Sequence, residues 1–151
     1  MKILLAVDGS PCSVAAVEEV AQRPWPEGSE IKVLSAFELP LPPTPEAWAL
    51  PPDCFEDLDR SAQAHARSIV QKAVETLKAK LNDSVVIKGE FAPGPARTLI
   101  LDEADDWAAD LIVMGSHGYR AWERFLLGSV SQAVVAHAKC SVEVVRHPKP
   151  E

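Results

Sequence analysis

The chain has few cysteines and no long apolar run. Its three cysteines, Cys12, Cys54 and Cys140, are widely separated and form no CxxC pair, so we expect reduced thiols rather than disulfides. The four histidines are equally dispersed, which gives a zinc site little support. No stretch approaches the roughly 20 apolar residues that a membrane span needs, and Asp8 interrupts the first apolar run too early for a signal peptide. These absences favour a cytoplasmic protein without membrane association.

Positive charge is also scarce. Lys and Arg number 15 against 22 for Asp and Glu, and the formal net charge is -7. The field of the whole protein therefore repels phosphates, so nucleic-acid binding is disfavoured and any anion site must be built locally. The length of 151 residues fits one domain. We expect that domain over residues 1–147, followed by a short tail at 148–151.

Short apolar runs alternate with helical patterns along the chain. The expected strands are 3–7, 30–37, 85–87, 110–114 and 141–146. Helices are expected to begin at Ser10-Pro11, near Glu56, at Pro95 and near Ser129. Parallel strands need crossover connections, and continuous apolar runs are typical of strands that are buried on both faces. The pattern predicts one Rossmann-like α/β domain with helices on both faces of a parallel sheet.

The pattern is regular in the first helix and breaks after the second strand. In the first helix, Val14, Val17 and Ala21 recur at helical spacing. Residues 38–53 contain six prolines and predict a long surface loop, because proline interrupts both helices and central strands. This loop is either a lid or a connector, and the connector is the favoured interpretation.

Two of the expected strand ends carry unusual sequence. The first strand leads into Asp8-Gly9-Ser10, and the fourth leads into the sequence GSHG at 115–118, followed by GSVS at 128–131. In open α/β sheets, ligands bind beyond the carboxyl ends of the strands. Gly115 and Gly118 can take positive φ and lack a Cβ, so backbone N–H groups can approach phosphate oxygens. The helix that begins near Ser129 adds unpaired amides, and the two turns together predict an anion site.

This glycine-rich segment matches neither of the common phosphate motifs. The chain has no Gly-Lys-Ser/Thr, and no GxGxxG follows the first strand. Ser129 and Ser131 offer hydroxyl donors, and a bound Mg²⁺ would offset phosphate charge. The alternative is that the glycines only end a strand and begin a helix. From the residues alone, both interpretations stay open.

Three blocks of sequence carry a resemblance to a known family. DLIVMGSHG at 110–118, LLGSVS at 126–131 and VEVV at 142–145 resemble the universal stress protein family. The spacing Gly-x2-Gly-x9-Gly-Ser resembles the motif of its ATP-binding branch, and residues 3–10 resemble its first strand and turn. The resemblance covers nearly the whole chain. It implies a five-stranded parallel sheet of order 3-2-1-4-5, a homodimer and ATP binding.

The resemblance also implies roles for individual positions. Asp8, which follows Val7, would lie beside the ribose and adenine, and Ala6 and Ala36 would contact the adenine. The wall beside the phosphates and ribose would begin at Met114 and Gly115. The triphosphate cradle would consist of Gly118, Gly128, Ser129, Val130 and Ser131.

Three kinds of side chain keep alternative interpretations. Asp8 can instead be a carboxylate that favours the start of a helix. His117 can touch a phosphate or be a solvated loop residue, and the second is favoured. Arg120 and Arg124 can neutralise phosphate charge, with one of the two expected to point into water.

The resemblance implies that the homodimer forms through the last strand, Ser141 to Arg146. Glu143 is a charged residue among the valines of this strand, and a charge in an edge strand can disfavour its pairing with the same strand of a second chain. The predicted function is an ATP-binding stress-response or regulatory protein with at most slow ATP hydrolysis, because no residue's spacing marks a catalytic base. The alternatives are a homodimeric interaction protein that binds no nucleotide, and a dedicated ATPase or phosphotransferase.

Overall fold

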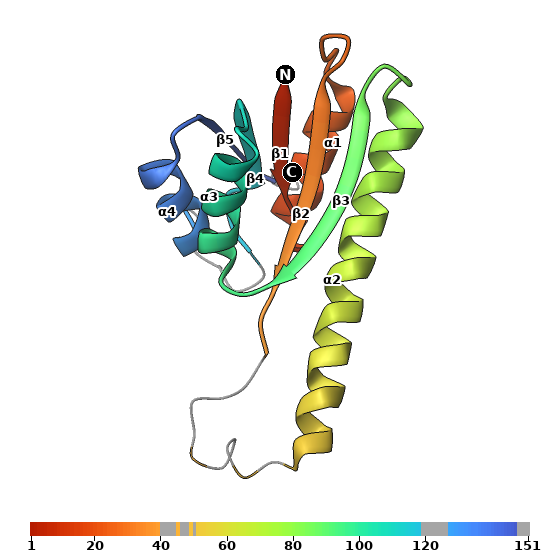
Figure 1. Ribbon diagram of the computed structural model, residues 1–151. Helices are drawn as coiled ribbons and strands as arrows, with labels where there is room; N and C mark the ends of the chain where they lie inside the picture. The colour runs from red at the N-terminus through yellow and green to blue at the C-terminus, as the bar shows by residue number, and fades with distance from the viewer. Residues whose placement is uncertain (40–44, 46–48, 50, 119–126, 148–151) are drawn as a thin grey trace.

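The computed structural model describes residues 1–39, 45, 49, 51–118 and 127–147 of the chain. Strands and helices alternate through these ranges (Figure 1). The elements are β1 (Lys2–Ala6), α1 (Pro11–Gln22), β2 (Glu30–Phe37), α2 (Pro52–Lys80), β3 (Val86–Pro93), α3 (Ala96–Asp106), β4 (Leu111–Gly115), α4 (Ser129–His137) and β5 (Ser141–Val145).

The strands form one parallel sheet in the order β3-β2-β1-β4-β5, which confirms the expected fold class. The chain winds outward from β1 in both directions, first through β2 and β3 and then through β4 and β5. Ala6 at the end of β1 is in register with Leu34 of β2 and with Met114 of β4. The carboxyl ends of three strands therefore meet at one place, where open α/β sheets bind ligands.

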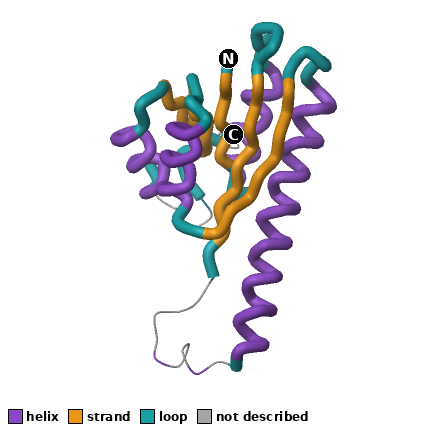
Figure 2. The backbone as a smooth tube through the Cα atoms, viewed as in Figure 1, coloured by secondary structure: helices purple, strands orange, loops and turns teal. Residues whose placement is uncertain are grey.

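Helices cover both faces of the sheet (Figure 2). Successive residues of β1 point to opposite faces, so Ile3 and Leu5 pack in one core and Leu4 and Ala6 in the other. The first core is shared with α1 and α2, and the second with α3 and α4. Both cores are built from apolar side chains that are almost fully buried. No helix in the described ranges is long and apolar enough to cross a membrane.

The start of α2 lies earlier than the sequence predicts. The helix begins at Pro52, four residues before Glu56, so Pro52 and Asp53 belong to it and not to a loop. The reason is that proline fits the first helical position, where its missing N–H would have no partner. The rest of the proline-rich segment falls largely outside the described residues. The amino-terminal half of α2 runs past the end of the sheet (Figure 1).

Other boundaries also differ from expectation. β1 ends at Ala6, one residue before Val7, and β4 extends to Gly115. β3 is much longer than the predicted 85–87, because all its residues pair with β2. It lies at the edge of the sheet, and many of its side chains are exposed. In α1, Val14 is 53% exposed, whereas Val17 and Ala21 are buried as their spacing indicates.

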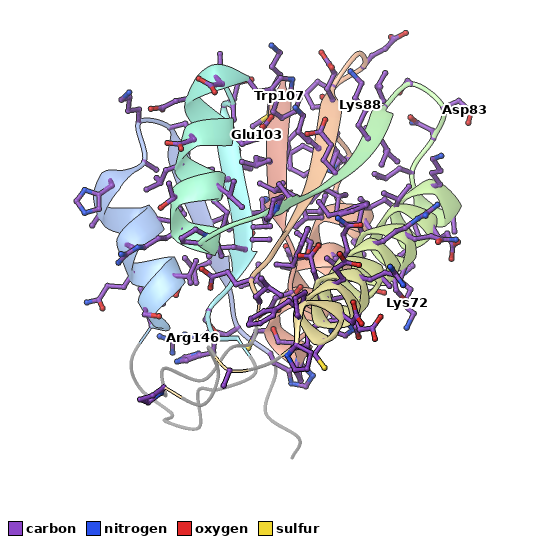
Figure 3. All side chains as sticks on the ribbon, turned by 60° about the horizontal axis from the view of Figure 1, so that its bottom comes forward. Lys72, Asp83, Lys88, Glu103, Trp107 and Arg146 are labelled. Carbon is purple, nitrogen blue, oxygen red and sulfur yellow. The ribbon has the colours of Figure 1, made fainter. Side chains whose placement is uncertain are left out.

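Lys32 is a charged residue within the sheet. It is buried in β2, and its ammonium group pairs with Glu103 of α3 and lies 3.5 Å from Glu90 of β3. The same ammonium lies 4.8 Å from the centre of the Trp107 ring, which Figure 3 shows beside Glu103 at the end of α3. Burial lowers the pKa of Lys32, but the hydrogen bond and charge of Glu103, helped by Glu90, raise it above its ordinary value. The lysine is therefore charged and paired within the fold.

Glu143, the charge in the last strand, has a partner inside the molecule. Both its carboxylate oxygens accept hydrogen bonds from the guanidinium of Arg23, one of them at 2.7 Å. Arg23 also donates to Glu19 at 2.9 Å. Hydrogen bonds to Glu143 and then Glu19 raise the pKa of Arg23. The charge of Glu143 is thus directed toward α1 and neutralised there.

Replacing Arg23 by Met should lower the free energy of unfolding by about 1 kcal/mol. The ion pair with Glu143 is bidentate and partly buried, so its contribution to stability should lie at the upper end of the values found for surface salt bridges. Lys139→Met is the matched control. Its pair with Asp105 leaves the Lys139 side chain 80% exposed, so its loss should change stability much less. Urea unfolding at low and high salt measures both, and the difference should shrink as salt screens the charges. Equal stabilities of the two variants at low salt would contradict this account of Glu143.

Candidate functional site

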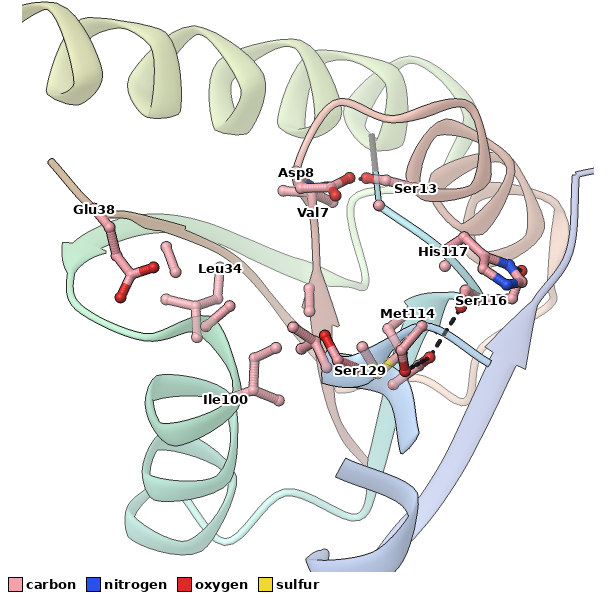
Figure 4. A pocket seen from close by; sticks show the side chains of 18 residues that line it. Val7, Asp8, Ser13, Leu34, Glu38, Ile100, Met114, Ser116, His117 and Ser129 are labelled. Carbon is pink, nitrogen blue, oxygen red and sulfur yellow. Dashed lines mark hydrogen bonds between the residues drawn. The ribbon is translucent and has the colours of Figure 1, made fainter. Parts of the chain in front are cut away.

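A cavity of about 540 Å³ opens at the carboxyl ends of β1, β2 and β4 (Figure 4). Its volume lies within the range typical of small-molecule sites, about 300–1,000 Å³. The lining residues are Ala6, Val7, Asp8, Ser13, Leu34, Ala36, Glu38, Ala96, Ile100, Met114, Gly115, Ser116, His117, Gly118, Gly128, Ser129, Val130 and Ser131. The cavity therefore lies at the point where the winding of the sheet reverses.

One part of the cavity is apolar. Leu34 and Met114 are buried side chains that flank Ala6 in the sheet, and Ile100 comes from α3. All of these side chains belong to the core between the sheet and α3 and α4, and Val130 of α4 packs against it. Figure 4 shows Leu34 and Ile100 on one side of the cavity, with Ser116 and His117 on the other. This apolar side suits a flat, weakly polar ring.

The start of α4 forms the polar side. Gly128 is the N-cap residue and has no side-chain cap, and its own N–H donates to the carbonyl of Ser116 at 2.8 Å. The next N–H groups, those of Ser129, Val130 and Ser131, have no acceptor within the described part of the chain. Unpaired amides at a helix start, together with the helix dipole, attract anions. The backbone of α4 thus presents donors to the cavity without a lysine.

Ser131 differs from its predicted role. Its side chain is buried, and its hydroxyl donates to the carbonyls of Ser116, at 2.9 Å, and Gly128, at 3.0 Å. The hydroxyl therefore holds the turn before α4 in place, and Ser131 has only its amide to offer a ligand. The Ser129 hydroxyl forms no hydrogen bond with any described residue.

Asp8 supports the start of α1 through one of its carboxylate oxygens. Its Oδ1 accepts a hydrogen bond from the N–H of Ser10 at 2.9 Å, and Ser10 is the N-cap of α1. Its own N–H donates to Ser13 Oγ at 3.1 Å. Its other carboxylate oxygen, Oδ2, lies against Gly118 and forms no hydrogen bond within the described ranges. One oxygen thus supports the helix start, and the second is available to a ligand.

Gly115 and Gly118 do not take positive φ, contrary to the prediction. Among the described glycines, positive φ occurs at Gly9, Gly28 and Gly94 instead. The need for glycine is steric. A Cβ on Gly115 would lie 2.7 Å from backbone atoms of α1, and one on Gly118 would lie 2.8 Å from Asp8 Oδ2. These two glycines let the start of α1 and Asp8 approach the end of β4 and the turn after it. Their role is therefore partly structural, which agrees in part with the alternative interpretation that the glycines only shape the turns.

His117 is not the freely solvated loop residue that the sequence favours. It is half-buried, and its Nδ1 lies 3.0 Å from the hydroxyl of Ser116, which in turn is 3.5 Å from Cys12 Sγ. Its carbonyl accepts a hydrogen bond from Ser10 Oγ at 3.2 Å. These bonds fix His117 in the wall because they connect it to both the start of α1 and the end of β4.

The charge of the cavity is mainly negative. The described lining residues include the carboxylates of Asp8 and Glu38 and no lysine or arginine. His117 is the one described lining side chain that can carry a positive charge. Arg120 and Arg124, predicted to neutralise phosphates, lie outside the described residues. No group of three His, Cys, Asp or Glu side chains that could hold a metal occurs in the described ranges.

Every predicted contact position except Arg124 lies in the lining of this one cavity. The sequence missed Ser13, Leu34, Glu38, Ala96, Ile100 and Ser116. Leu34 could have been found, because it lies two residues before Ala36 and so shares its face of β2. Ala96 and Ile100 carry no local signal of ligand binding, since only the tertiary position of α3 brings them here.

Comparisons with known proteins identify a family. The model of the Universal stress protein family matches residues 1–146. A universal stress protein of Methanocaldococcus jannaschii is 31% identical over 99% of this chain and 84% of its own length. One from Thermus aquaticus is 33% identical over 95% of this chain and 97% of its own length.

Solved structures of universal stress proteins share the fold of this chain. The structure of UspA from Lactobacillus plantarum superposes with a TM-score of 0.77 at 25% identity, over 97% of both chains. A family protein from Arabidopsis thaliana, solved with AMP bound, has a TM-score of 0.69 at 19% identity over 98% of this chain and 92% of its own. Another universal stress protein, solved in complex with cAMP, has a TM-score of 0.69 at 23% identity, over 98% of both chains.

Proposed function

Because the chain belongs to the universal stress protein family, we propose that it binds an adenine nucleotide, specifically ATP with Mg²⁺, in the cavity at the switch point of the sheet. The observation that carries the proposal is the row of unpaired amides at the start of α4, which faces a cavity with an apolar side. The AMP and cAMP bound by two structural relatives support the choice of an adenine nucleotide.

The cavity suggests how the nucleotide lies. The base fits the apolar side, between Ala36 and Ile100. The ribose hydroxyls are then donors to Asp8 Oδ2, the oxygen that is not used by the start of α1. The phosphates reach the amides of Ser129 to Ser131, where charge-assisted hydrogen bonds are shorter and stronger than neutral ones.

We propose that the nucleotide is bound for regulation or a stress response, in the cytoplasm, where the three free cysteines would stay reduced. Tight binding requires no catalytic group, whereas hydrolysis requires a base that is positioned for water. Of the candidate bases among the described lining residues, Asp8 and His117 are held by hydrogen bonds to the protein, and Glu38 lies exposed just beyond the end of β2. We therefore expect any hydrolysis to be slow.

The role of the amides is tested by replacing Ser129 with Pro. Proline removes the N–H at the first helical position, where it is well tolerated, and Gly128 already has the extended conformation that precedes proline. Ser129→Ala is the matched control, since it removes the hydroxyl and keeps the amide. In calorimetric titrations with AMP and ATP, Ser129→Pro should bind about tenfold more weakly than Ser129→Ala, the effect of one charge-assisted hydrogen bond.

The outcomes of this titration separate the candidate functions. Binding by the wild type that is equal in the two Ser129 variants would place the phosphates elsewhere. An absence of binding by the wild type, with no thermal shift on adding nucleotide, would favour the alternative of an interaction protein whose glycine turn is structural.

The need for Mg²⁺ follows from the charge of the cavity. The described lining residues offer two carboxylates and neither lysine nor arginine, so a triphosphate meets repulsion that a bound cation would offset. We expect chelation of Mg²⁺ to weaken ATP binding about tenfold or more, and to change AMP binding much less because AMP carries less charge. Parallel titrations with Mg²⁺ and with EDTA measure this. Equal losses for the two nucleotides would speak against a phosphate-bound cation.

We further propose that the protein forms a homodimer through β5, which lies at one edge of the sheet. The N–H of Ser116 donates to the carbonyl of Val145, so the main-chain groups of Val145 face β4 and those of Val144 face the open edge. The ion pair with Arg23 directs Glu143 toward α1, which leaves that edge accessible to a second chain.

Val144→Pro should therefore convert a dimer to a monomer while leaving the pairing with β4 intact, because proline removes only an outward N–H. Sedimentation equilibrium measures the mass, and circular dichroism checks that the variant folds. A wild-type protein that stays monomeric at high concentration would rule out the dimer, and an unchanged dimer in the variant would place the interface elsewhere.

A further inference from the structure

A second cavity, of about 420 Å³, lies between the end of β2 and the amino-terminal half of α2. It is on the opposite face of the sheet from the apolar side of the first cavity, because its lining comes from α2 rather than α3 and α4. The lining residues are Asp8, Ser35, Ala36, Phe37, Glu38, Leu58, Ser61, Ala62, His65, Ala66 and Ile69. This cavity is also within the size range of small-molecule sites.

The body of the second cavity is apolar. Phe37 of β2 forms one wall, and its ring centre lies 6.3 Å from that of Phe91 on the neighbouring strand. Leu58, Ala62 and Ile69 recur at helical spacing on α2 and form the opposite wall. Such a space between an aromatic and an aliphatic wall takes a flat apolar group.

Ser35 places an unused hydroxyl in this apolar space. The residue is 1% exposed, yet its hydroxyl forms no hydrogen bond within the described part of the chain. No fully enclosed side-chain oxygen or nitrogen is left unpaired among the described residues, so the Ser35 oxygen must be open to the cavity that it lines. A buried hydroxyl without a partner is unfavourable unless water or a ligand satisfies it. The hydroxyl therefore marks a polar contact point for a ligand.

The rim of the cavity selects the charge of that ligand. Asp8 and Glu38 form the wall that the two cavities share, and both carboxylates are exposed at its edge. Carboxylates accept hydrogen bonds and repel anions. Ser61 and His65 complete the polar lining and bring no fixed positive charge. The polar part of a ligand is therefore expected to be an N–H donor, neutral or cationic.

We propose that the second cavity is a separate binding site for a small apolar amine, with its rings between Phe37 and the Leu58–Ile69 face of α2 and its polar group at Ser35. The proposal does not depend on nucleotide binding, since the apolar walls and the Ser35 hydroxyl belong to the second cavity alone.

The test uses two dyes that share one skeleton. N-phenyl-1-naphthylamine is a neutral aromatic amine, and 8-anilino-1-naphthalenesulfonate is the same amine with a sulfonate added. Both gain fluorescence in an apolar site. Titrated into the protein without nucleotide, the neutral amine should bind about tenfold or more tightly than the sulfonate, because the carboxylates at the rim repel the anion. Equal or tighter binding of the sulfonate, or no binding of the neutral amine, would overturn the proposal.

Two substitutions on α2 place the dye. Ala62→Phe fills the cavity, whereas Ala64→Phe puts the same group on an exposed position of the helix outside the lining. The first should abolish binding of the neutral amine and the second should leave it unchanged. Ser35→Ala, which leaves the packing nearly intact, should weaken binding about threefold to tenfold, the effect of one hydrogen bond.

The Ser35 variant also decides the matter if Ala62→Phe proves unfolded by circular dichroism. Wild-type affinity in Ser35→Ala, or equal affinity in the two folded phenylalanine variants, would mean that the dye adheres elsewhere and would refute the site. Calorimetry with AMP on the same proteins reports the nucleotide cavity independently. A failure of one site is thus distinguishable from a failure of the other.

Discussion

The pairing of β1 with β2 on one side and β4 on the other is the constraint on which the rest of the molecule depends. Because the crossovers of parallel strands are right-handed, a chain that winds outward from β1 in both directions must place its helices on opposite faces. The connections then diverge at the ends of β1 and β4. The larger cavity opens there, and its lining includes Ala6 with its sheet neighbours Leu34 and Met114.

The chemistry of the cavity follows from this divergence. An acidic chain offers no general attraction for an anion, so the favourable groups must be dipoles held by the fold. The turn before α4 is fixed by Ser131 and by the N–H of Gly128, both of which donate to the carbonyl of Ser116. These bonds fix the position of the helix start, whose first amides are unpaired within the described part of the chain, as they are at other helix starts. The hydrogen bonds that hold the turn thus leave the amides of Ser129, Val130 and Ser131 unused.

The sequence predicts what depends on local pattern and misses what depends on distant contacts. The limits of β2 are correct, and the ends of β1 and β4 meet at the cavity as predicted, because apolar runs and glycine turns are local features. The length of β3 was missed because Lys88, Gly89 and Glu90 interrupt any strand pattern, and only pairing with β2 keeps them extended.

The errors within the site have the same origin. The hydroxyl of Ser131 was predicted to be a donor to a ligand, but it is used within the fold by the carbonyls of Gly128 and of Ser116, the second of them fifteen positions away in the chain. Gly115 and Gly118 looked like residues chosen for positive φ, whereas their Cβ positions are blocked by α1 and Asp8. Neither contact leaves a trace in the residues nearby. Motifs therefore indicated which residues line one cavity, and tertiary packing determines which contacts each of these residues makes.

The end of β2 shows how one strand can serve two cavities. Successive residues of a strand point to opposite faces, so Ser35 faces the space under α2, and Leu34 faces the space beside α3. Ala36 and Glu38 lie where the strand leaves the sheet, and each lines both cavities. Across the gap, Asp8 does the same from the end of β1. The two linings thus share the carboxylates of Asp8 and Glu38, whereas the apolar side chains that face each cavity come from opposite faces of the sheet.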